Sequence, residues 1–217
     1  MPYAPTIIED DGYWMEEGRK PMRKIEPVVL EGRFVRLEPL ERHHEGGLNA
    51  IAGDPEIWSS FTSDLAVPEN MRAWIEKALA NRAIGTEQPF VTIDRATGAI
   101  VGGTRVMDIR EAHDAVEIGA TWLGRPWWRT AFNSESKYLL LRHLFDTIDC
   151  HRVCLKTDLL NERSQRAIER LGAVREGVLR KHMIVQDGRS RDSVYYSIID
   201  DEWATVRARL EQNLYAD

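Results

Sequence analysis

Residues 156–180, KTDLLNERSQRAIERLGAVREGVLR, contain the most informative junction in the chain. An alternating strand over Arg152–Thr157 is followed by Asn161, a favoured residue at a helix N-cap. The pattern of Glu162–Leu171 predicts a helix, and Gly172 stands where a left-handed residue would end it. The stretch therefore predicts a strand that leads directly into a capped helix.

Trp122–Lys137, WLGRPWWRTAFNSESK, forms a second junction of the same kind. An apolar strand over Ala115–Leu123 enters a turn, and a long helix follows with an apolar stripe made of Tyr138, Leu141, Leu144, Phe145 and Ile148. The first amides of a helix lack intrahelical partners and attract anions. Two such junctions in one small chain predict a bound phosphorylated cofactor.

The remaining pattern alternates short strands with amphipathic helices. Strands are predicted over 32–40, Phe90–Asp94, Ala99–Met107 and, around the turn QDG, within Val174–Ile199. Helices are predicted over Glu41–Ala52 and Pro68–Ala83, and a short final helix begins at Asp200. This order predicts an α+β fold in a single domain of residues 28–217.

Residues 1–27 precede this domain as an N-terminal extension, with charges of both signs and several prolines. We expect a partly ordered arm that packs through Tyr13, Trp14 and Met15. The alternative is a contact between copies of the chain, which would make a homo-oligomer.

The composition argues against several classes of protein. A net charge of −6 over 217 residues disfavours binding along nucleic acid, which draws on many Lys and Arg contacts. No apolar run approaches the roughly 20 residues of a membrane helix, and no secretory signal pattern opens the chain. The cysteines and histidines show no metal-ligand spacing. We therefore expect a cytoplasmic protein without a metal, a nucleic-acid partner or a membrane partner.

The two junctions resemble those of the GCN5-related N-acetyltransferases, and within them the RimJ/RimL branch of ribosomal-protein N-terminal acetyltransferases. The resemblance covers about residues 30–200 and is carried by EIGATWL (117–123), WWRTAFNSESK (127–137) and 156–180. It implies a mixed, mostly antiparallel sheet that splays between two parallel strands, near Ile118–Leu123 and Val153–Thr157. It also implies that acetyl-CoA, or another acyl-CoA, lies in the gap as co-substrate.

The resemblance further implies that the pyrophosphate of the cofactor rests on the turn before the long helix. The family pattern falls on 126–131, where Arg129 replaces a glycine and Ala131 is the permitted small residue. We expect Asn133 or Ser134 to cap the helix, with Thr130 offering another hydroxyl. The implied cofactor contacts around this turn are Trp122, Leu123, Arg129, Thr130, Ala131, Phe132, Asn133 and Ser134.

Asn161 and Ser164 are the implied contacts at the other junction. Asn161 is either an N-cap alone or also a pantetheine contact through its side-chain amide. The tyrosine with which many relatives protonate the thiolate is missing, because Ile168 occupies its position. The resemblance assigns that role to Ser164, and an ordinary first-turn serine is the alternative.

Glu117 is the predicted general base, because a carboxylate facing the cleft from this strand can take a proton through water. The alternative is a surface glutamate, since the alternation of a strand does not reveal which face is covered. Lys156 and Asp158 are weaker candidates. Trp58 and Phe61, in EIWSSFTSD, are predicted to line the acceptor pocket.

The residues and the resemblance together predict an acyl-CoA-dependent N-acyltransferase, in which a primary amine attacks the thioester directly. The acceptor is a small molecule or a protein N-terminus. The alternative is a catalytically silent acyl-CoA-binding or regulatory module, favoured by the missing turn glycine and the missing tyrosine. The retention of Glu117, Asn161 and Ser164 disfavours that alternative.

Overall fold

The computed structural model describes residues 20–216, and within them the alternating segments of the sequence pair into one mixed sheet. Its strands are β1 Leu30–Glu31, β2 Val35–Pro39, β3 Gln88–Asp94, β4 Ile100–Arg110, β5 Ala115–Leu123, β6 Arg152–Asp158, β7 Val174–Ile184 and β8 Ser190–Ile199. The α-helices are α1 Glu45–Ile51, α2 Pro68–Ala83, α3 Ala131–Arg142, α4 Glu162–Leu171 and α5 Asp200–Tyr215. The short helical turns are η1 Arg42–His44, η2 Pro55–Ile57, η3 Glu111–His113, η4 Arg125–Trp127 and the π-helical η5 His143–Thr147.

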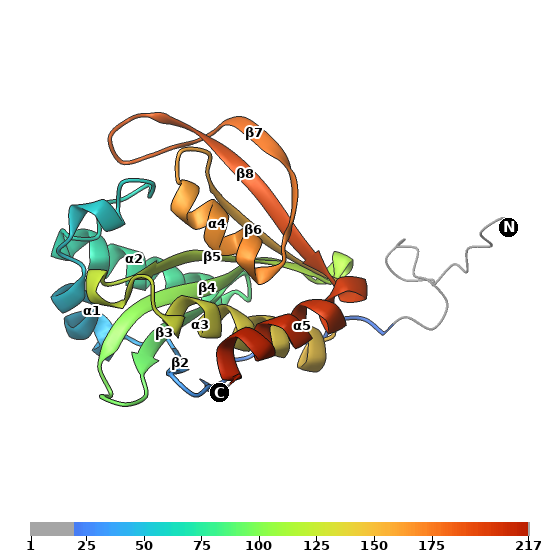
Figure 1. Cartoon of the computed structure of the whole chain (residues 1–217). Helices are drawn as coiled ribbons and strands as arrows, with labels where there is room; N and C mark the ends of the chain where they lie inside the picture. The colour runs from blue at the N-terminus through green and yellow to red at the C-terminus, as the bar shows by residue number, and fades with distance from the viewer. Residues whose placement is uncertain (1–19, 217) are drawn as a thin grey trace, which may run out of the picture.

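The strands follow the order β1-β2-β3-β4-β5-β6-β8-β7, and every neighbouring pair is antiparallel except β5 and β6 (Figure 1). This arrangement confirms the predicted α+β fold with one parallel pair. The predicted bounds of α2, β5 and α4 are also confirmed. Gly172 ends α4 with φ of 101°, the left-handed conformation expected of it.

Two helix predictions were wrong in extent. Residues predicted as one helix over Glu41–Ala52 form the 3₁₀ turn η1 followed by α1. The final helix is 16 residues long rather than short. Its length follows from packing, because Trp203, Val206 and Leu210 are all buried.

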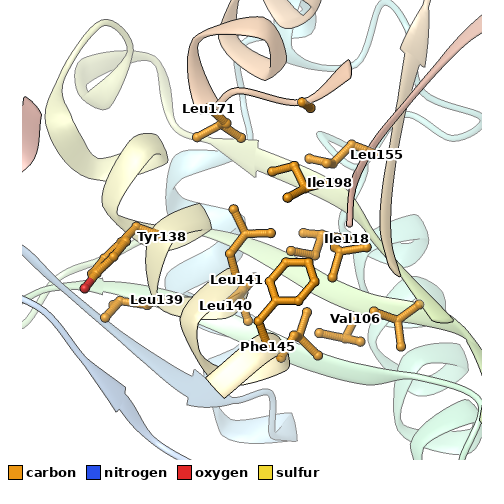
Figure 2. Close-up of a cluster of buried hydrophobic side chains, with 14 of the residues drawn as sticks. Val106, Ile118, Tyr138, Leu139, Leu140, Leu141, Phe145, Leu155, Leu171 and Ile198 are labelled. Atoms are coloured by element: carbon orange, nitrogen blue, oxygen red, sulfur yellow. The ribbon is translucent and has the colours of Figure 1, made fainter. Parts of the chain in front are cut away.

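Two apolar clusters cover opposite faces of the sheet. The larger lies under α3, α4 and α5, where Leu139, Leu140 and Leu141 meet Val106 and Ile118 of the sheet (Figure 2). The smaller lies under α1 and α2 and includes the side chains Leu48, Met71, Ile75, Val91 and Trp122. Burial of each such side chain stabilises the fold by about 1.5–3 kcal/mol.

A buried carboxylate anchors α3 to the β1–β2 turn. Glu135 accepts hydrogen bonds of 2.7 Å from the three successive backbone N–H groups of residues 33–35. It also accepts one of 2.8 Å from the Tyr215 hydroxyl. Gly32 leaves room for this carboxylate, since a Cβ there would lie 2.4 Å from its carbon. The orientation of α3 is therefore tied to the β1–β2 turn and to the end of α5.

The parallel strands separate soon after they pair. Their register runs from Ala115 opposite Arg152 to Glu117 opposite Cys154 and ends there, while β6 stays paired with β8 to its end. At Ala120, β5 adopts a left-handed φ of 48°, and its register with β4 shifts beside that residue. The predicted splay of the two strands is thus confirmed, and a bulge lies where it opens.

The segment after η2 bridges to the β7–β8 turn. The carbonyl of Phe61 accepts a hydrogen bond of 3.0 Å from the backbone N–H of Gln186. The carbonyl of Ser60 accepts one of 2.9 Å from Nη1 of Arg191. These contacts hold residues 54–61 near the carboxyl end of β6 and the start of α4.

The last residues of the predicted extension, 20–27, lie against the domain. The backbone N–H of Met22 donates to Asp114 Oδ1 at 2.8 Å, and that of Arg23 donates to the carbonyl of Ile148 at 2.7 Å. The predicted contacts of Tyr13, Trp14 and Met15 lie outside the described residues.

Candidate active site

Glu117 lies at the last paired position of β5, where the two parallel strands begin to separate. It is only 3% exposed, so the surface-glutamate alternative was wrong. Its Oε2 accepts a hydrogen bond of 2.7 Å from Nζ of Lys156. A Cβ built on Gly119 would lie 2.8 Å from its Oε1. The lack of a side chain at Gly119 therefore lets the carboxylate lie along β5 toward the bulge at Ala120.

Tyr195 of β8 and His182 of β7 extend this polar row across the sheet. Nζ of Lys156 lies 5.7 Å from the Tyr195 ring centroid, and the Tyr195 hydroxyl lies 3.3 Å from Nε2 of His182. Burial, together with the cations Lys156 and Arg191, lowers the pKa of His182. Burial raises the pKa of Tyr195. At neutral pH this row therefore contains a neutral imidazole and a protonated phenol.

Asp158, the other carboxylate considered as a base, is engaged elsewhere. Its Oδ2 accepts a hydrogen bond of 2.5 Å from Nη2 of Arg189, and its Oδ1 accepts one of 3.0 Å from the backbone N–H of Leu160. Burial by itself would raise the pKa of Asp158, but these two bonds hold it below its ordinary value. The residue is therefore a buried anchor for the β7–β8 hairpin.

Lys137 of α3 is an ionisable group of this region that the sequence analysis did not single out. Its Nζ lies behind the β5 bulge, 3.2 Å from Oγ1 of Thr104 and also hydrogen-bonded to Oγ1 of Thr121. Burial lowers the pKa of Lys137 to about 7, against the attraction of Glu117. A sequence signal existed, because Lys137 shares the i, i+4, i+7 spacing of Leu141 and Leu144 on the buried stripe.

The turn before α3 uses an unusual backbone conformation. Arg129 has φ of 61°, in the left-handed region that a glycine at this position would adopt without a steric penalty. Thr130 is the N-cap, since its Oγ1 accepts 3.3 Å from the backbone N–H of Phe132. The prediction that Asn133 or Ser134 caps the helix was wrong, because α3 begins at Ala131 and both lie inside its first turn. The exposed Arg129 and Thr130 and the half-buried Asn133 and Ser134 surround the amino end of a 12-residue helix. Such a helix end favours an anion.

Trp122 and Leu123 end β5 beside this turn. The carbonyl of Leu123 accepts 2.8 Å from Nε1 of Trp128, so one of its lone pairs is already used. The Trp122 ring packs into the smaller apolar cluster, 4.9 Å from the ring of Trp58. Any contact of this strand end with a cofactor would therefore run through its backbone.

Asn161 caps α4, and its Oδ1 accepts 3.0 Å from the backbone N–H of Ser164. This geometry confirms the N-cap and leaves the side-chain NH₂ of Asn161 as a donor. The hydroxyl of Ser164 makes no hydrogen bond with another residue of the described range. Both side chains are half-buried, and both follow the carboxyl end of β6.

Trp58 and Phe61 differ from the predicted pair of pocket walls. Trp58 is fully buried, and its Nε1 donates 2.8 Å to the carbonyl of Ala52, so its assignment to the acceptor pocket was wrong. Phe61 is partly exposed and packs edge-on against Trp58 at 5.3 Å. The indole belongs to the core because the loop-like segment around it folds inward as η2.

Within residues 20–216, no group of three or more His, Cys, Asp or Glu side chains could hold a metal ion. The same range contains no helix long and apolar enough to cross a membrane.

Comparison with known proteins gives one consistent family. The sequence profile of the acetyltransferase (GNAT) domain matches residues 35–174. A crystal structure named as a "putative acetyltransferase" from T. thermophilus is 40% identical, covers 88% of this chain and 99% of its own, and superposes with a TM-score of 0.79. A GCN5-related N-acetyltransferase from Brucella melitensis is 29% identical and covers 93% of this chain and 91% of its own, with a TM-score of 0.85.

A curated relative of Bacillus subtilis, "Putative ribosomal N-acetyltransferase YdaF", is 26% identical over 106 residues. That match covers 49% of this chain and 57% of the relative, so the chain spans little more than half of that protein's length.

Proposed function

The chain belongs to the GNAT family of acetyltransferases, and from this premise we propose that it transfers an acetyl or other short acyl group from CoA to a primary amine. The observation that carries the proposal is the divergence of β5 and β6 after Glu117, with a bulge at Ala120. The thioester arm would lie along the edge of β5 that β6 leaves uncovered. The diphosphate of the cofactor would rest on the amino end of α3.

The proposed reaction is direct attack within a complex of both substrates. Glu117, through a water, removes a proton from the ammonium form of the acceptor. The free amine attacks the thioester carbonyl, the N–C bond forms, and the C–S bond breaks as the tetrahedral intermediate collapses. The nitrogen releases its second proton to solvent. Ser164 donates its hydroxyl proton to the departing thiolate and regains a proton from solvent. Products are the N-acylated acceptor and CoA.

Lys156 supports this role of Glu117. Its Nζ donates to Oε2 at 2.7 Å and fixes the position of the carboxylate, while Oε1 faces along β5 toward the bulge.

The acceptor class is also a proposal. The curated relative is named for ribosomal N-acetylation, which makes protein N-terminal amines the first class to test. Small-molecule amines are the second class.

The test is release of free CoA thiol from acetyl-CoA in the presence of peptide N-termini and of small amines. Glu117→Gln should abolish most of the release, and the matched variant Glu176→Gln, which loses an ion pair with Arg152, should keep it. Binding of CoA without turnover across both panels would refute transfer and leave the catalytically silent acyl-CoA-binding module. Absence of any CoA binding would refute both the acyltransferase and the acyl-CoA-binding module.

A further inference from the structure

Two arginines and one indole form a fixed cationic cluster between the amino ends of α3 and α4. The guanidinium carbon of Arg163 lies 3.5 Å from the Trp128 ring centroid, and that of Arg125 lies 4.5 Å from it. The hydrogen bond from Trp128 to the Leu123 carbonyl holds the indole in place. The ring therefore positions both cations through cation–π contacts. We call these three residues the Arg–Trp–Arg cluster.

An acidic side chain from a distant part of the sequence occupies this cluster. Glu56 of η2 accepts a short hydrogen bond from Arg125, and its Oε1 lies 3.7 Å from Nη1 of Arg163. Asp54 lies 3.7 Å from Arg125, but it also caps η2 by accepting from the Glu56 backbone N–H at 2.9 Å. Among residues 20–216, the Glu56 carboxylate makes no such local bond, and its polar contacts are with the two arginines.

The hollow around Glu56 contains the guanidinium groups of Arg125, Arg129 and Arg163 and the carboxylates of Glu56 and Glu162. It is lined by residues of η2 and η4, by the turn before α3 and by the start of α4. Burial lowers the pKa of Arg163, and the like charges of Arg125 and Arg129 lower it further, while Glu56 raises it. Arg129 makes no ion pair with another residue in the described part of the chain. The Glu56 carboxylate thus shares the hollow with three guanidinium groups, while Glu162 pairs with Arg166 on its own helix.

We propose that Glu56 competes with the 3′-phosphate of CoA for the Arg–Trp–Arg cluster, and that the bound phosphate displaces it. The inference rests on the proposed function, in which the diphosphate uses the amides of α3 and leaves the 3′-phosphate in need of its own cations. A phosphate monoester is a dianion whose oxygens can accept from both guanidinium groups at once. The ion pair it replaces is weak, because Glu56, Arg125 and Arg163 are each about half exposed.

Displacement of Glu56 by the 3′-phosphate would make the conformation of residues 54–61 depend on bound cofactor. Release of Glu56 frees one end of a segment whose other end is bonded to the β7–β8 turn through Ser60 and Phe61. Affinity for CoA is then set partly by a carboxylate that touches no part of the thioester.

The test compares CoA with dephospho-CoA, which lacks only the 3′-phosphate, by calorimetric titration of the whole chain. We expect Glu56→Gln to bind CoA about twofold to fivefold more tightly than the wild type, since removal of one surface ion pair is worth no more. Its affinity for dephospho-CoA should not change. Arg163→Gln should lose the preference for CoA over dephospho-CoA. Glu76→Gln, which breaks the exposed pair with Arg42, is the matched control and should bind both as the wild type does.

Two results would overturn the inference while leaving the proposed function intact. One is an unchanged CoA affinity in Glu56→Gln, and the other is an equal gain for CoA and dephospho-CoA. Failure of the wild type to bind either nucleotide would refute the proposed function itself. Thermal melting of each variant establishes that it is folded before titration.

Discussion

Replacement of Lys137 by methionine should stabilise the protein at neutral pH. The side chain is only 5% exposed, and the two threonine hydroxyls that it contacts also hydrogen-bond each other at 2.8 Å. Methionine keeps nearly the same chain length and removes the charge. The hydroxyls of Thr104 and Thr121 keep one another as partners, so the substitution leaves neither unpaired.

The magnitude follows from the pKa of Lys137, which burial lowers from 10.5 to about 7. The unfolded chain keeps its proton up to about pH 10.5, so between pH 7 and 10.5 it holds one proton more than the folded chain. The free energy of unfolding of the wild type therefore rises with pH across this window. Below pH 7, burial of the charged amine destabilises the folded state by the full amount of about 5 kcal/mol. Between about pH 7.5 and 9.5 the penalty shrinks by about 2–3 kcal/mol.

Urea unfolding followed by tryptophan fluorescence measures both effects, since the chain has seven tryptophans. The free energy of unfolding of Lys137→Met should exceed that of the wild type by about 2–4 kcal/mol at about pH 7.5, after about 1 kcal/mol is subtracted for lost hydrogen bonds. This difference in free energy should be smaller at about pH 9.5. Lys77→Met, on the exposed side of α2, controls for the loss of one positive charge. A gap that is the same at both pH values would refute burial of a charged amine as its cause.

Three further substitutions test the site and its support. Glu117→Gln should lower kcat/KM about 100-fold to 10,000-fold if the carboxylate is the base, and an unchanged value would remove it from the mechanism. Ser164→Ala should lower kcat by about 10-fold to 100-fold with unchanged CoA affinity, whereas unchanged kcat would leave Ser164 as a helix residue only. Gly32→Ala should destabilise the fold by about 1–3 kcal/mol in urea unfolding, because its Cβ would collide with the Glu135 carboxylate; equal stability would show that this carboxylate can move aside.

Local signals explain the elements whose ends were predicted correctly. Asn161 and Gly172 mark the two ends of α4, and Pro68 marks the first residue of α2. Each signal acts within a few residues, through a side-chain cap or a restricted φ. Such boundaries need no knowledge of what packs against the helix.

The misassigned residues depend on contacts between distant segments. Trp58 looked like a loop residue, but the fold of η2 turns it into the core beside Trp122. The burial of Glu117 depends on β6, whose Cys154 lies opposite it and whose Lys156 donates to its carboxylate. The same limit applies to Lys137, whose burial depends on the sheet behind it, although its place on the apolar stripe was visible in the sequence.

Because three backbone amides donate to the Glu135 carboxylate, their hydrogen exchange can report on changes in α3. The N–H groups of residues 33–35 all donate to this one side chain, which is the fifth residue of the helix whose amino end is the proposed anion site. Their hydrogen exchange measures how often these hydrogen bonds open. An anion that settles on the helix should slow exchange at residues 33–35, although none of them would touch it. The same amides should exchange faster in a chain shortened by its last three residues, which lacks Tyr215.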